Sequence, residues 1–108
     1  MPQDRRAEPR YPARIAVTVQ LAEGSVLAYS QNLSVSGAFL ECDAAVAERD
    51  AVELRLPAHV GIDPIVVGAE VRWVARGPEG EVVGIGVRFA GMRARDMRAW
   101  TRYIRTLK

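Results

Sequence analysis

Hydrophobic and polar residues alternate along several short segments of this chain, as they do in β-strands that bury one face. The first segment covers residues 15–21, where the alternate apolar positions are Ile15, Val17, Val19 and Leu21. Further strands are predicted at residues 26–30, 38–42, 52–56, 65–73 and 83–89. Six short strands at this spacing predict an all-β fold, a six-stranded antiparallel β-barrel without exposed sheet edges.

The apolar period changes from two residues to 3.6 beyond Gly91, which predicts an amphipathic C-terminal α-helix over residues 92–108. One stripe of this helix is apolar and consists of Met97, Trp100, Ile104 and Leu107. A nearly opposite stripe is basic and consists of Arg95, Arg98, Arg102 and Arg105. We expect the apolar stripe to pack against the barrel, with Trp73, Phe89 and Trp100 as core residues.

Residues 1–14 form a different kind of segment, rich in proline and arginine. Pro2, Pro9 and Pro12 disfavour helix and favour extended backbone at the preceding residue. The expected organisation is therefore a single domain of 108 residues, with a flexible arginine-bearing arm over residues 1–14, a barrel over 15–90 and the helix over 92–108.

Composition fits a soluble cytoplasmic protein. Cys42 is the single cysteine, which excludes an internal disulfide and suits a reducing compartment. No segment approaches the roughly 20 apolar residues that span a bilayer, and the charged N-terminus does not resemble a signal peptide. The net charge of +2 conceals two basic ends, which suggest surfaces that face anions.

Two polar clusters carry the candidate chemistry. The first contains Arg5, Arg6 and Arg10, and the second is the segment Asn32-Leu33-Ser34-Val35-Ser36-Gly37 between two apolar runs. A guanidinium group matches phosphate oxygens and the O6/N7 edge of guanine, and it can stack on a base. Asn and Ser add directional hydrogen bonds, and glycine lets the backbone approach a ligand closely. These residues together indicate a site for an anionic guanine nucleotide.

The order of the two clusters resembles the PilZ domain family, small bacterial β-barrels that bind the second messenger cyclic di-GMP (c-di-GMP). The family signature is R-x-x-x-R, followed by D or N and then x-S-x-x-G. Here the first element reads Arg6-Ala7-Glu8-Pro9-Arg10 and the second runs from Asn32 to Gly37. Val71-Arg72-Trp73 and residues 84–89 are similar to the last barrel strands of the family, so the resemblance covers nearly the whole chain.

The resemblance implies a role for each motif residue. Arg6 and Arg10 would contact phosphate and guanine, while Asn32 and Ser34 would meet the Watson–Crick edge or N2 amine of one guanine. Asn offers one neutral acceptor where Asp offers two anionic oxygens, so we expect somewhat weaker binding than with Asp. Arg5 precedes the motif, and a basic residue there is associated in the family with capture of two nucleotides rather than one.

Structural interpretations of the same residues stay open. The arm could be a solvated basic segment without a ligand. The second cluster could be a turn in which Asn32 bonds its own backbone and Gly37 has a positive φ. Arg72 and Arg88 fall on outward strand positions, where simple exposure is the first interpretation and a phosphate contact the alternative.

The leading functional hypothesis is a cyclic di-GMP receptor that needs no metal or cofactor. Its arm would become ordered on the ligand and so regulate a separate effector protein or a second copy of the chain. One alternative is a ligand-independent PilZ-like adaptor, and another is nucleic-acid binding through the C-terminal arginine stripe. An enzyme is disfavoured because the sequence shows no acid–base pair, nucleophile or metal constellation, and the single histidine, His59, has no partner at a catalytic spacing.

Overall fold

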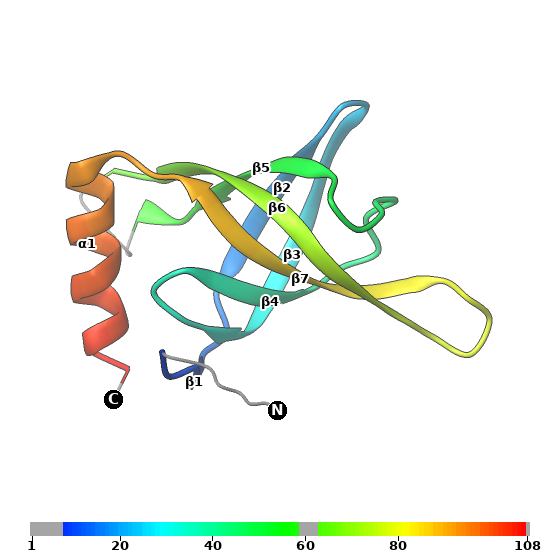
Figure 1. The fold of residues 1–108 in the computed structure, drawn as a ribbon, viewed down its shortest axis with the longest axis horizontal. Coiled ribbons are helices and arrows are strands. Elements are labelled where there is room, and N and C mark those ends of the chain that lie inside the picture. The colour runs from blue at the N-terminus through cyan, green and yellow to red at the C-terminus, as the bar shows by residue number, and fades with distance from the viewer. Residues whose placement is uncertain (1–7, 59–62, 108) are drawn as a thin grey trace.

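The computed structural model describes residues 8–58 and 63–107, which form seven strands and one helix (Figure 1). The strands are β1 (Tyr11–Pro12), β2 (Ala16–Leu21), β3 (Gly24–Leu33), β4 (Gly37–Glu41), β5 (Ala51–Leu56), β6 (Ile65–Arg76) and β7 (Val82–Gly91). Helix α1 (Ala94–Arg105) follows them. No helix in this part of the chain is both long enough and apolar enough to cross a membrane.

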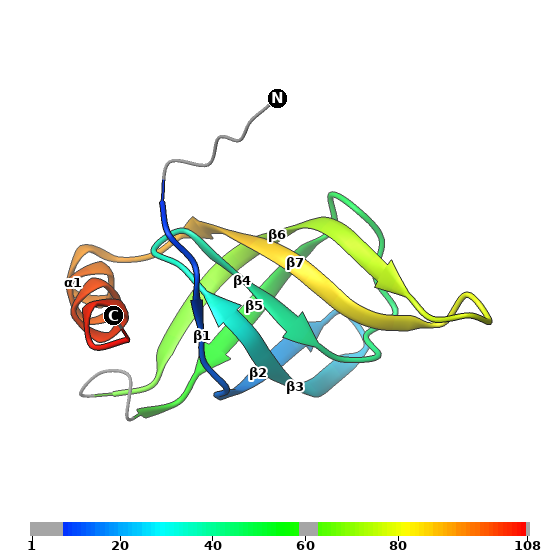
Figure 2. The same cartoon turned by 90° about the horizontal axis from the view of Figure 1, so that it is seen from below.

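The strands close into the predicted antiparallel barrel. Their order is β3-β2-β5-β6-β7-β4, and a further pairing between β3 and β4 completes the ring (Figures 1 and 2). The prediction of a six-stranded barrel is thereby confirmed. Strand β1 is an addition that the apolar pattern did not predict: it pairs with the end of β3, with Tyr11 opposite Leu33 and Pro12 opposite Asn32.

The barrel interior is filled by the alternate apolar residues of the strands. Val19, Ala28, Leu33, Leu40 and Leu54 are completely buried. Full burial of one such Leu or Val side chain stabilises the fold by about 1.5–3 kcal/mol. The alternation seen in the sequence is therefore the pattern of inward and outward positions in the barrel wall.

Helix α1 packs beside one end of the barrel (Figure 1) and contributes Trp100 and Ile104 to the core. The Trp100 ring meets Phe89 edge-on, with 5.5 Å between ring centroids. Asp96 is also buried in the first turn, where it accepts a hydrogen bond from Arg93 Nε at 3.2 Å and suits the positive end of the helix dipole. The prediction for Met97 was wrong: it is 40% exposed, because Asp96, Trp100 and Ile104 occupy the inner face.

The prediction of Trp73 as a core residue was also wrong, since this side chain is 47% exposed. The pairing of β6 with β7 shifts here: Val71 lies opposite Val87, yet Trp73 lies opposite Gly86. The additional residue in β6 is a β-bulge, which turns Trp73 to the outer face. There its ring stacks on Phe39, with centroids 4.9 Å apart and planes 11° from parallel. Gly86 makes room for the indole, because a Cβ at this position would overlap Trp73 Nε1.

Candidate functional site

The turn between β3 and β4 contains the end of the second motif and is held by its own hydrogen bonds. The Ser34 amide donates to the Gly37 carbonyl at 2.9 Å, and the Gly37 amide donates to Ser34 Oγ at 3.1 Å. Gly37 does not have the positive φ considered above, since the positive-φ glycines of the described segments are Gly24 and Gly80. Glycine is required for another reason: a Cβ on Gly37 would overlap the Val87 carbonyl oxygen of β7.

A second contact fixes this turn to the helix. Trp100 Nε1 donates a hydrogen bond of 3.0 Å to the Ser34 carbonyl oxygen, and both residues are almost completely buried. A buried carbonyl needs such a partner, because leaving it unpaired costs about 1–3 kcal/mol. Ser34 is therefore a structural anchor of the turn in this state, with its hydroxyl group directed at Gly37.

The two motif elements meet at Arg10 and Asn32. Arg10 Nη1 donates a hydrogen bond of 2.8 Å to Asn32 Oδ1. The short strand β1 explains this contact across the sequence, because it places Pro12 opposite Asn32 and so carries Arg10 to the end of β3. The exposed guanidinium group is thus held in place while it can still reach a ligand.

Glu8, between the motif arginines, contacts the same turn. Its Oε1 accepts a hydrogen bond from the Ser36 amide at 3.0 Å and another from the Ser36 hydroxyl group. Partial burial acts to raise the pKa of Glu8, but the hydrogen bonds from Ser36 and Ser34 and the charge of Arg10 outweigh it. The pKa of Glu8 is therefore lowered and the side chain is a carboxylate at neutral pH.

These residues surround a pocket of about 360 Å³ on the outer face of the barrel. Its lining combines the arm, the turn and the two long strands, and consists of Glu8, Arg10, Ser36, Gly37, Arg72, Trp73, Gly86, Val87 and Arg88. Three arginines, from the arm, β6 and β7, give it a predominantly basic lining suited to phosphate, although Arg72 also pairs with Glu70 at 3.1 Å. Arg72 and Arg88 are exposed, as expected, and both line the pocket. Trp73 was missed because only the bulge in β6 brings it to this face.

The predicted site residues are distributed as follows. Arg10 and Gly37 line the pocket, Asn32 bonds Arg10, and Ser34 supports the turn beneath them. Arg5 and Arg6 lie outside the described residues, as does His59. Among the residues that the structure describes, no group of three or more His, Cys, Asp or Glu side chains could hold a metal ion.

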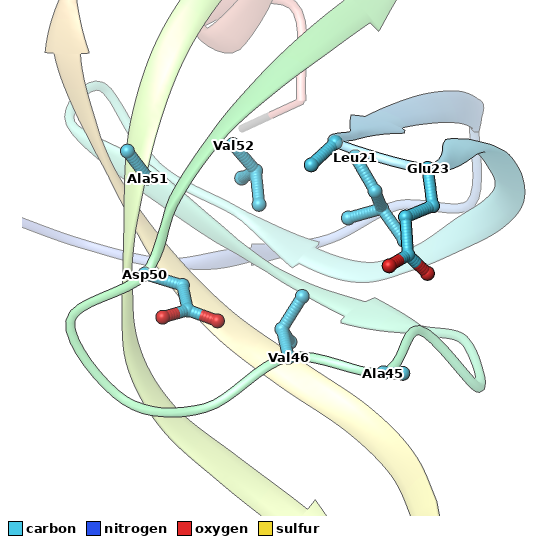
Figure 3. A pocket seen from close by; sticks show the side chains of 8 residues that line it. Leu21, Glu23, Ala45, Val46, Asp50, Ala51 and Val52 are labelled. Atoms are coloured by element: carbon cyan, nitrogen blue, oxygen red, sulfur yellow. The ribbon is translucent and has the colours of Figure 1, made fainter.

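Another pocket, of about 340 Å³, lies at the opposite end of β3, next to the β2–β3 turn (Figure 3). Figure 3 shows the carboxylates of Glu23 and Asp50 beside the apolar side chains of Leu21, Val46 and Val52. This acidic lining would repel an anionic nucleotide. The arginine-lined pocket is therefore the better candidate site.

The basic stripe of α1 is exposed, as predicted, at Arg95, Arg98, Arg102 and Arg105. Part of its charge is neutralised, because Arg95 pairs with Asp63 at 3.5 Å and approaches Asp96 at 4.0 Å. Nucleic-acid binding by this stripe stays a prediction, since no contact among residues 8–58 and 63–107 specifically favours it.

Trp100→Phe should lower the free energy of unfolding by about 1–3 kcal/mol, because the Ser34 carbonyl loses its buried donor while an aromatic ring remains. Urea unfolding measures this difference. Trp73→Phe is the matched control on the exposed face, with an expected change below about 0.5 kcal/mol. Equal stability of the two variants would contradict an anchoring role for the hydrogen bond.

Comparison with known proteins agrees with this arrangement. The chain matches the family model of the PilZ domain over residues 4–106. A search of curated proteins found no match.

Solved structures give the same fold at low sequence identity. The PilZ domain of Escherichia coli YcgR with c-di-GMP has a TM-score of 0.75 and 16% identity, covering 96% of this chain and 92% of that one. Bacillus subtilis MotI/DgrA, an inhibitor of motility, has a TM-score of 0.77 and 21% identity, covering 96% and 51%. MrkH of K. pneumonia, in a complex with c-di-GMP, has a TM-score of 0.77 and 18% identity, covering 97% and 53%. The chain spans about half the length of MotI/DgrA and MrkH.

The match to the family model extends over nearly all of the sequence, and the chain therefore belongs to the PilZ domain family.

Proposed function

We propose that this chain is a receptor domain for cyclic di-GMP, which it binds in the arginine-lined pocket. The observation that carries the proposal is the hydrogen bond between Arg10 and Asn32, because it joins the two motif elements at the rim of a pocket that also contains Arg72 and Arg88. The structures of YcgR and MrkH with c-di-GMP support the same ligand.

The pocket chemistry matches a ligand with two phosphates and two guanines. The guanidinium groups of Arg10, Arg72 and Arg88 suit phosphate oxygens or guanine O6 and N7. Trp73 stacks on Phe39, and the exposed part of its ring in the pocket offers a platform for a guanine base. Stacking of this kind contributes about 1–3 kcal/mol per base, and a charge-assisted hydrogen bond contributes about 1.5–3 kcal/mol. A few such contacts reach the roughly 8 kcal/mol of a micromolar complex.

The arm supplies the remaining contacts in this proposal. Arg6 joins Arg10 on the first nucleotide, and Arg5 admits a second one. The role is binding rather than catalysis, with neither a metal nor a cofactor required. Its output is a changed surface near the arm, the motif turn and α1, which regulates a separate effector protein or a second copy of the chain.

Calorimetric titration with cyclic di-GMP tests the proposal, with GMP and cyclic di-AMP as controls. Saturable binding in the micromolar range, selective for cyclic di-GMP, is the expected result. Two nucleotides per chain would support the role given to Arg5. The absence of both binding heat and a thermal shift at high ligand concentration would refute the receptor function and favour the ligand-independent adaptor.

A further inference from the structure

Glu8 places a carboxylate in the pocket that is otherwise built for an anion. The residue lies between the two motif arginines and is half-buried. Its Oε1 accepts from both the amide and the hydroxyl group of Ser36, at the rim of the same pocket. The Ser36 amide and hydroxyl group could each donate a hydrogen bond to a phosphate, but here both donate to Glu8.

The charged group that acts on this carboxylate is Arg10 of the arm, and the hydrogen bonds to it come from Ser34 and Ser36 of the turn. Arg72 of β6 and Arg88 of β7 line the same pocket, and Arg72 pairs there with the Glu70 carboxylate at 3.1 Å. A phosphodiester anion would draw on these arginines and on Ser36. Two like charges that share one small site repel each other, so the carboxylate and a phosphate exclude one another.

We propose that Glu8 is an internal competitor of the nucleotide: its carboxylate occupies the anion position on Ser36 in the unliganded protein and leaves it when a phosphate binds. This inference rests on the proposed function and adds a residue that sets the affinity of the site. Glu8 is only two residues from Arg10, so its release also frees the arm to reorient that guanidinium group toward the ligand.

Displacement of Glu8 makes ligand binding depend on pH. In the free protein the hydrogen bonds from Ser36 lower the pKa of Glu8, and in the complex, where the released carboxylate is solvated, the pKa returns to the ordinary range of a glutamate. The complex therefore binds protons more readily than the free protein does. Affinity should consequently rise as the pH falls through the ordinary pKa of a glutamate toward the lowered pKa of Glu8 in the free protein.

The test titrates Glu8→Gln and Glu8→Ala with cyclic di-GMP at neutral pH and physiological salt. We expect both variants to bind about tenfold more tightly than the wild type, because the competing charge is gone. Glu53→Gln is the matched control: it removes the same charge from an exposed position on β5, and its effect should stay below about twofold. The rise in affinity at low pH should disappear in Glu8→Gln.

Unchanged or weaker binding in both Glu8 variants would overturn the inference, and weaker binding would show that the carboxylate holds the ligand instead. Inorganic pyrophosphate serves as a second probe, since it presents phosphate without guanine. If cyclic di-GMP fails to bind but pyrophosphate binds Glu8→Gln more tightly than the wild type, the proposed function fails and the competition stands. If neither probe distinguishes Glu8→Gln from the wild type, the competition is refuted.

Discussion

Arg10→Ala should weaken the binding of cyclic di-GMP by more than about tenfold and leave the fold intact. Arg10 is exposed and bonds Asn32, so its removal costs the fold little. The site loses the guanidinium group that both motif elements position. One or two charge-assisted hydrogen bonds are lost at about 1.5–3 kcal/mol each, so affinity should fall by a factor between about ten and on the order of ten thousand. Calorimetry measures the affinity, and a thermal melt checks the fold.

Arg55→Ala is the matched control for Arg10→Ala. Arg55 is an exposed arginine on the outer face of β5. Its partner on β6 is Val66, which lies six residues before Arg72 along that strand. Its removal changes the net charge equally without touching the pocket. Wild-type affinity in Arg10→Ala, or an equal loss in Arg55→Ala, would show that general charge rather than this site holds the nucleotide.

Gly37→Ala should destabilise the protein by about 2–3 kcal/mol and weaken nucleotide binding as well. The new Cβ would overlap the Val87 carbonyl oxygen, and because this atom belongs to the backbone, β4 and β7 would have to separate. The motif turn ends at Gly37, which is hydrogen-bonded to Ser34, so Ser34 and Ser36 would move with it. Urea unfolding gives the stability, and titration of the folded variant gives the affinity.

Gly68→Ala provides the comparison for Gly37→Ala. Gly68 lies within β6, and a Cβ there would meet nothing within 4 Å. Its replacement should be neutral or slightly stabilising, since alanine costs less conformational entropy than glycine. Similar unfolding free energies for the two variants would contradict the close approach of Gly37 to β7.

The sequence was sufficient to predict the barrel and the helix, and it identified residues of the candidate site that the fold brings together. Alternation identifies strands because the inward residues of every barrel strand must be apolar, and the helix period identifies α1 for the same reason. The motif placed Arg10 and Asn32 in one candidate site, and the structure shows a hydrogen bond between their side chains.

Other features depend on partners that are distant in the sequence. Trp73 continues the alternation of β6, and only the register against Gly86 reveals the bulge that turns it outward. Strand β1 is two residues long and contains Pro12, so its pairing with β3 leaves no periodic signal. Glu8 occupies a variable position of the motif, and nothing local indicates that its partner is Ser36, 28 residues away.

The hydrogen bond from Trp100 to Ser34 joins the helix to the turn whose residues Ser36 and Gly37 line the arginine-lined pocket. Thermodynamic linkage makes any such coupling reciprocal. A partner protein that binds α1 and strains this hydrogen bond lowers the affinity of the nucleotide by some factor. The bound nucleotide then lowers the affinity of α1 for that partner protein by the same factor. A coupling of about 1.4 kcal/mol, within the range of one buried hydrogen bond, corresponds to a tenfold factor in each direction. In the proposed receptor, this one hydrogen bond would couple a partner on α1 to the nucleotide in both directions.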